Sequence, residues 1–128
     1  PPLPPGVPAR PRILVVEDSP TVRALTGIAI EAAGWEVAWA GSSEEAMGLL
    51  GTGVFVALLA DINLPGMSGD ELAVIARKSQ PGLRCMLMTA RPRSRWPRMP
   101  DDIPIFPKPL DMDLLVRELG SIRMMLEG

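Results

Sequence analysis

The sequence predicts an α/β domain in which helices cover both faces of a parallel sheet. Segments with strand composition alternate along the chain with segments of helical periodicity. The central strand segments are apolar at nearly every position, which is typical of strands buried on both faces. The chain has 128 residues, enough for one domain with a single hydrophobic core. Such a sheet requires right-handed crossovers between its strands.

The first strand is expected at residues 12–16, where RILVV is short, apolar and rich in β-branched residues. Ser19 and Pro20 then begin a helix, with the proline in its first turn. Apolar residues recur at helical spacing until Gly34, which is a typical helix end. The chain therefore opens with one strand and one helix.

The second strand is expected at residues 35–40, followed by a short helix that opens at SSEE (42–45) and ends at Gly51 or Gly53. The third strand, VFVALLA at residues 54–60, is fully apolar and is predicted to be buried.

Turn residues follow the third strand in NLPGMSG, and a third helix is expected at residues 70–78. The fourth strand follows at residues 83–88 after the turn Pro-Gly. A short fifth strand is expected at residues 103–106, and the last helix at residues 110–126. Helices and strands thus alternate almost to the end of the chain.

The composition excludes several kinds of chemistry. With 47% hydrophobic and 22% charged residues, the chain is globular and neither disordered nor fibrous. It contains no histidine, so it can form no Ser-His-Asp triad, no histidine metal site and no phosphohistidine of its own. The single cysteine, Cys85, lies in an apolar strand and is expected to pack in the core.

The net charge of −2 gives no indication of a nucleic-acid-binding protein. A local exception is a group of four arginines, Arg91, Arg93, Arg95 and Arg98. The simplest interpretation is a solvated loop, and the alternative is a contact surface for an acidic partner.

Six of the 15 prolines stand within residues 1–11, which predicts an extended linker before a domain at residues 12–128. The chain begins with proline, so we expect a domain from a longer protein; a tail on a free-standing protein is the competing explanation. No segment approaches the ~20 apolar residues of a membrane span, and no signal peptide is visible. We therefore expect a cytoplasmic location without direct membrane contact.

Reactive side chains follow four of the predicted strands. Glu17 and Asp18 follow the first strand, Asp61 the third, Thr89 the fourth and Lys108 the fifth. Ligands of open parallel sheets bind at the carboxyl ends of the strands. We therefore expect three carboxylates, a hydroxyl and an ammonium group to meet at one edge of the sheet.

Three neighbouring carboxylates repel one another unless a cation lies among them, and Mg²⁺ prefers such oxygen ligands. We expect Asp18 and Asp61 as direct ligands, with a main-chain carbonyl from the loop after Asp61 and with Glu17 acting through water. A carboxylate held in this way can attack a phosphoryl group and form an acyl phosphate. Lys108 would neutralise the phosphoryl oxygens, and Thr89 would donate a hydrogen bond to them.

Each of these residues alone has a simpler structural explanation, such as a helix cap or a solvated charge. Their occurrence together, in the required order, favours the site.

The segments ILVVEDSPTVR, LLADINLPGMSGDEL, MLMTA and FPKP together resemble the receiver domain of two-component response regulators. The resemblance implies a flavodoxin-like (βα)5 three-layer sandwich with the sheet order 2-1-3-4-5. It implies Asp61 as phosphoacceptor and Mg²⁺ held by Asp18, Asp61 and the carbonyl of Asn63, with Glu17 assisting. Thr89 and Lys108 match the switch hydroxyl and the active-site lysine of the family. The proline that follows this lysine in the family, here Pro109, often forms a cis peptide bond with it.

The chain departs from the family pattern between Thr89 and Lys108. Prolines at positions 92, 97 and 100 would interrupt a long helix, so the fourth helix is expected to be short, irregular or missing. The family's switch aromatic lies three residues before the lysine, where this chain has Ile105. Phe106 beside it should point to the other face of the strand.

The resemblance implies a phosphoacceptor of a phosphorelay, and we expect the receiver of a hybrid histidine kinase. The partner of this chain would be a histidine kinase or phosphotransfer domain. A phosphohistidine of that partner would pass the phosphoryl group to Asp61. We expect no enzymatic activity other than acceptance and autodephosphorylation of the phosphoryl group. We also expect no nucleic-acid partner. A homodimer through residues 91–104 is left open.

Two other functions and one other fold share some of these sequence features. The first function is a degenerate receiver that only mediates protein contacts. The second is a haloacid-dehalogenase-like phosphatase, which needs a second aspartate where the chain has Asn63. A dinucleotide-binding fold would need a glycine-rich turn after the first strand, and EDSPT supplies none.

Overall fold

The computed structural model describes residues 10–127 of the chain. The predicted proline-rich linker, residues 1–11, lies almost entirely outside the described residues. The strands are β1 (Arg12–Val16), β2 (Glu36–Ala40), β3 (Ala57–Asp61), β4 (Arg84–Thr89) and β5 (Ile105–Pro107). The helices are α1 (Pro20–Ala32), α2 (Ser43–Thr52), α3 (Gly69–Ser79) and α4 (Met112–Glu127).

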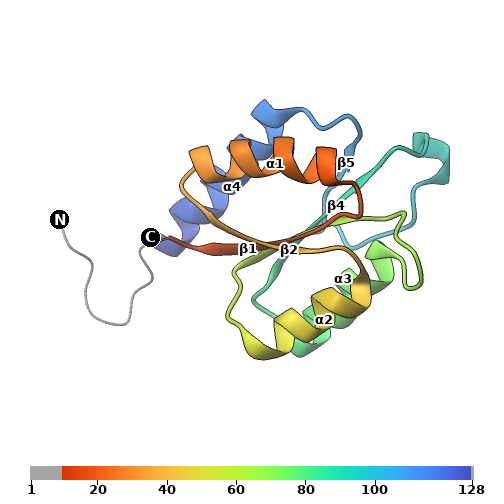
Figure 1. Cartoon of the computed structure of the whole chain (residues 1–128), viewed down its shortest axis with the longest axis horizontal. Coiled ribbons are helices and arrows are strands. Elements are labelled where there is room, and N and C mark those ends of the chain that lie inside the picture. The colour runs from red at the N-terminus through yellow and green to blue at the C-terminus, as the bar shows by residue number, and fades with distance from the viewer. Residues whose placement is uncertain (1–9, 128) are drawn as a thin grey trace.

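The strands form one parallel sheet in the order β2-β1-β3-β4-β5, as the resemblance implies. Helices α1 and α4 cover one face of this sheet, and α2 and α3 cover the other (Figure 1). The predicted α/β class and the three-layer arrangement are therefore confirmed. Among the residues described, no helix has both the length and the apolar character needed to cross a membrane.

The hydrophobic core consists of two layers, one on each face of the sheet. Alternate residues of a strand enter opposite layers, so Leu14 packs toward α2 and α3 whereas Ile13 packs toward α1 and α4. Trp35, at the entrance to β2, is fully buried in the layer beneath α1 and α4. Burial on both faces explains why β1 and β3 are apolar throughout.

Helix α1 begins and ends as the sequence predicts. The hydroxyl of Ser19 accepts a hydrogen bond from the N–H of Val22 at 3.4 Å, and Pro20 occupies the first turn. The chain leaves the helix through Gly34, whose φ of 91° is readily adopted only by glycine. The Ser19-Pro20 start and the Gly34 turn thus set the length of α1, after which the chain returns to pair β2 with β1.

Two of the predicted strand boundaries are wrong. Strand β3 begins at Ala57 and not at residue 54, because Val54 points into solvent and Phe55 turns back into the core below the Arg12 guanidinium. Strand β5 begins at Ile105, because the Ile103 N–H donates to the Pro100 carbonyl at 2.9 Å and closes a turn there. Strand β1 has its predicted bounds, and the remaining boundaries differ from prediction by two residues or fewer.

The segment between β4 and β5 contains a single 3₁₀ turn (Arg93–Arg95) in place of a helix, which confirms the predicted irregularity. Ile105 packs against the core layer under α2 and α3, whereas Phe106 packs against the opposite layer. The expected orientation of these two residues is therefore confirmed. The Lys108–Pro109 peptide bond is cis, as the resemblance implies.

Candidate functional site

The carboxyl ends of the strands bring the predicted charged residues together. Glu17 directly follows β1, Asp61 ends β3, and Lys108 directly follows β5. The Lys108 Nζ atom donates to Asp61 Oδ2 at 2.6 Å and to Glu17 Oε2 at 2.7 Å. One ammonium group thus joins carboxylates from two neighbouring strands.

Asp18 completes an acidic group with Glu17 and Asp61. One carboxylate oxygen from each of the three residues lies within 4.8 Å of the others. Glu17 and Asp61 are buried, whereas Asp18 is exposed and leaves the group open to solvent. Hard oxygen donors in this arrangement fit a divalent cation such as Mg²⁺, which commonly combines one or two carboxylates with water.

Burial and neighbouring charges change the proton affinities of the site. Burial is the largest effect on Glu17, and it raises the pKa of this carboxyl despite the hydrogen bond from Lys108. Burial alone would lower the pKa of Lys108. The hydrogen bonds to Asp61 and Glu17 and their negative charges outweigh burial and raise the pKa, so the lysine is held in its charged form.

The backbone around Asp61 is fixed by the start of α3. The N–H of Asn63 donates to Asp61 Oδ1 at 2.8 Å, and the N–H of Gly69 donates to the Ile62 carbonyl at 3.1 Å. Gly69 lies so close that a Cβ atom there would be 2.7 Å from the Asp61 carbonyl carbon. This close approach of α3 to β3 fixes the backbone that carries the Asp61 side chain.

Thr89 and Asn63 form a second part of the site. The Thr89 hydroxyl accepts a hydrogen bond from the Arg91 N–H at 3.0 Å and lies 3.2 Å from the Asn63 amide. With the amide turned so that both of its ends are satisfied, its nitrogen donates to Thr89. Its oxygen then accepts from Nε and Nη2 of Arg91, each at 3.1 Å. Asn63 therefore links the loop after Asp61 to the loop after β4.

Arg91 is the residue of this site that sequence reasoning missed. Arg91 is exposed, as expected of a solvated loop, but its guanidinium also contacts the Asn63 amide, which the sequence did not indicate. Its position two residues after a strand-end threonine is the signal that could have identified it. Only the folded arrangement shows that this arginine faces the loop after Asp61.

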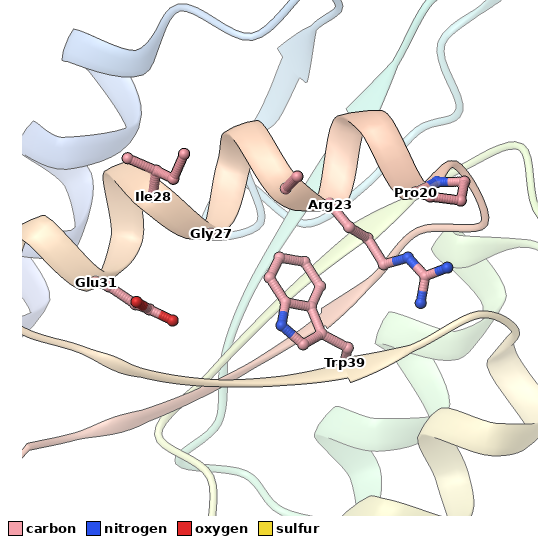
Figure 2. Close-up of a pocket in the computed structure, with 7 residues that line it drawn as sticks. Pro20, Arg23, Gly27, Ile28, Glu31 and Trp39 are labelled. Carbon is pink, nitrogen blue, oxygen red and sulfur yellow. The ribbon is translucent and has the colours of Figure 1, made fainter.

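A separate hollow of about 400 Å³ lies away from these residues, between α1 and β2. The Trp39 ring lies beneath Gly27, with Arg23 and Glu31 nearby on the same helix (Figure 2). None of the acidic residues of the site lines this hollow. The strand-end group, and not this hollow, is therefore the candidate for chemistry.

The chain matches the response regulator receiver domain family over residues 13–96. The response regulator receiver protein CpdR of Brucella abortus is 34% identical over 117 residues, covering 87% of this chain and 95% of CpdR. The response regulator FleR of Pseudomonas aeruginosa is 33% identical over 79 residues, and the match spans 17% of FleR. The chain is thus similar to nearly all of one relative and to a small part of the other.

Solved structures of response regulators and receiver domains are also similar to this chain. The response regulator TrrA of Thermotoga maritima, in complex with Mg²⁺ and BeF, is 29% identical with a TM-score of 0.79, covering 88% of this chain and 98% of TrrA. TrrA has also been solved in complex with the histidine kinase ThkA. The receiver domain of the hybrid histidine kinase CckA is 27% identical with a TM-score of 0.72, covering 87% of this chain and 97% of that domain.

Proposed function

The chain belongs to the response regulator receiver family of two-component signalling, and on this premise we propose that Asp61 is its phosphoacceptor. The observation that carries the proposal is the position of Asp61, which is buried beside Glu17 and Asp18 and paired with Lys108 at 2.6 Å. This arrangement provides both a nucleophile and positive charge for a phosphoryl group.

In the proposed reaction, an oxygen of Asp61 attacks the phosphorus of a phosphohistidine on a partner protein. The P–O bond forms as the P–N bond breaks, and the imidazole leaves and takes up a proton. The product on this chain is an acyl phosphate. The donor must be another protein or domain, since this chain contains no histidine.

The other residues stabilise the added charge. Lys108 would move its ammonium group from Asp61 to a phosphoryl oxygen, and the Thr89 hydroxyl would leave Asn63 and donate to another. Glu17, Asp18, Asp61 and the Asn63 carbonyl would hold Mg²⁺, which when bound neutralises charge on the transferring group. TrrA, whose structure contains Mg²⁺ and BeF, supports this assignment.

We propose a histidine kinase or phosphotransfer domain as the partner, and the complex of TrrA with ThkA supports this choice. The similarity to the CckA receiver supports a hybrid kinase as parent protein, with residues 1–11 as linker and residues 12–128 as receiver. A cytoplasmic location and autodephosphorylation are further parts of this proposal. The alternative is a receiver that binds partners without being phosphorylated.

The test is phosphorylation with acetyl phosphate, with and without Mg²⁺, followed by mass spectrometry of the intact chain. We expect a gain of one phosphoryl group that requires Mg²⁺ and is absent in Asp61→Asn. Asp113→Asn is a matched control because Asp113 is an exposed aspartate on α4 and does not belong to the acidic group of the site. A chain that gains no mass and shows no Mg²⁺-dependent binding of beryllofluoride would be a protein-interaction receiver instead.

A further inference from the structure

The loop between β4 and β5, residues 90–104, concentrates positive charge in an otherwise slightly acidic chain. Within eight residues it carries Arg91, Arg93, Arg95 and Arg98, all of them exposed. None of the ion pairs formed among residues 10–127 involves these arginines. Four guanidinium groups this close together, with no carboxylate paired to them, repel one another, and an anion would relieve that repulsion.

The loop has a defined conformation although it forms no helix. The Trp96 indole N–H donates to the Arg91 carbonyl at 2.9 Å, and the Arg95 N–H donates to the Pro92 carbonyl at 2.8 Å. The Arg93 guanidinium lies over the Trp96 ring, 5.1 Å from its centroid. A loop ordered in this way loses little conformational entropy when a ligand binds.

The chemistry of these residues fits an anion that also carries a flat ring. Guanidinium groups pair with phosphate oxygens through two parallel hydrogen bonds, and indole and guanidinium planes stack on nucleobases. The net charge of −2 is unfavourable for a nucleic-acid polymer. Asp101 and Asp102 also limit the basic stretch to one short loop.

We propose that residues 91–98 bind a small nucleotide, with the arginines on its phosphates and Trp96 against its base. Arg91 is already engaged with the Asn63 amide, so the proposed contacts are Arg93, Arg95, Arg98 and Trp96. An acidic peptide would satisfy the arginines equally well. It would make no use of an indole that is fixed beside a guanidinium group, and this favours the nucleotide.

The test is a titration of the full chain, followed by calorimetry, with adenosine and guanosine monophosphates, triphosphates and cyclic dinucleotides. Inorganic pyrophosphate and hexaglutamate are the comparison ligands. We expect saturable binding of at least one nucleotide that weakens as salt increases. Arg93→Ala and Arg95→Ala should each weaken it about tenfold. Trp96→Ala should also weaken it about tenfold, and Trp96→Phe less.

Arg117→Ala is the matched control, because Arg117 is exposed on α4 and lies outside the loop. It should bind the nucleotide as the unmodified chain does. Failure of every nucleotide to bind overturns the proposal. Pyrophosphate binding as tightly as the best nucleotide would show that Trp96 contributes nothing, and tighter binding of hexaglutamate would identify an acidic protein as the partner. Because the test does not use Asp61, it stands or falls separately from the phosphoacceptor proposal.

Discussion

Gly69→Ala is the perturbation whose effect follows most directly from the structure. Gly69 is buried at the start of α3, against the strand that carries Asp61. A Cβ atom at this position would overlap the Asp61 carbonyl oxygen. It would also lie 2.7 Å from the Asp61 carbonyl carbon and 3.2 Å from the Ile62 Cα. These neighbours are backbone atoms of a buried strand, so they cannot move aside without displacing β3 or α3.

The size of the effect can be worked out from this overlap. Carbon atoms prefer separations of about 3.5–4.0 Å, so the helix and strand must separate by roughly 1 Å. Overpacking of a close-packed core costs about 1–3 kcal/mol, and we expect the free energy of unfolding to fall by that amount. Since the displaced backbone belongs to Asp61, Mg²⁺-dependent binding of beryllofluoride should weaken as well.

Urea denaturation followed by circular dichroism measures the first effect, and beryllofluoride titration the second. Gly48→Ala is the matched control, because nothing lies within 4 Å of a Cβ built there. Gly48 lies inside α2, so this control should gain about 0.5–1 kcal/mol from the better helix former. A Gly69→Ala chain as stable as the unmodified one, with unchanged beryllofluoride binding, would refute the argument from the α3–β3 contact.

Three further predictions concern other parts of the molecule. Lys108→Met removes the cation between Glu17 and Asp61, which should destabilise the metal-free chain by about 3–5 kcal/mol. Mg²⁺ should then raise the variant's urea midpoint more than the unmodified chain's, and an equal rise would contradict this reasoning. Burial raises the pKa of the Cys85 thiol from 9.0 to about 11. The thiol therefore ionises first in the unfolded chain, and its contribution to stability is complete below pH 9 and is lost toward pH 11. The stability difference between the unmodified chain and Cys85→Ala should shrink by about 2 kcal/mol between pH 8 and pH 11, and a constant difference would argue against this burial effect. Gly34→Ala should lower the melting temperature through a loss of about 1–2 kcal/mol, because Gly34 has a φ of 91°. Gly120→Ala, with open space around its Cβ, should not lower it.

The fold could be predicted because its determinants are local. Apolar runs gave the strands, and a serine–proline pair and a glycine gave the limits of α1, so element order required no tertiary information. The boundary at β3 could not be predicted in this way. Val54 and Phe55 are as apolar as the strand that follows, and only the packing of Phe55 against the core and Arg12 shows that the chain turns there.

The site shows the same division. Glu17, Asp18, Asp61, Thr89 and Lys108 could be placed together because parallel strands deliver their last residues to one edge of the sheet. The contact between Arg91 and Asn63 depends on how two loops approach each other, which no periodicity encodes. Loop-to-loop contacts of this kind are where sequence patterns carry the least information.

That unpredicted contact connects the two proposed sites. Thr89 now accepts from the Arg91 N–H and contacts Asn63, so turning its hydroxyl toward a phosphoryl group on Asp61 breaks these hydrogen bonds. Arg91 is the first arginine of the loop between β4 and β5. Loss of its contacts with Thr89 and Asn63 would therefore change the start of that loop. Ile105 offers no aromatic ring through which the movement could pass instead. We therefore expect binding at either proposed site to alter the other, and by thermodynamic linkage both affinities would change by the same factor. Beryllofluoride that leaves nucleotide affinity unchanged would show that Arg91 does not connect the sites.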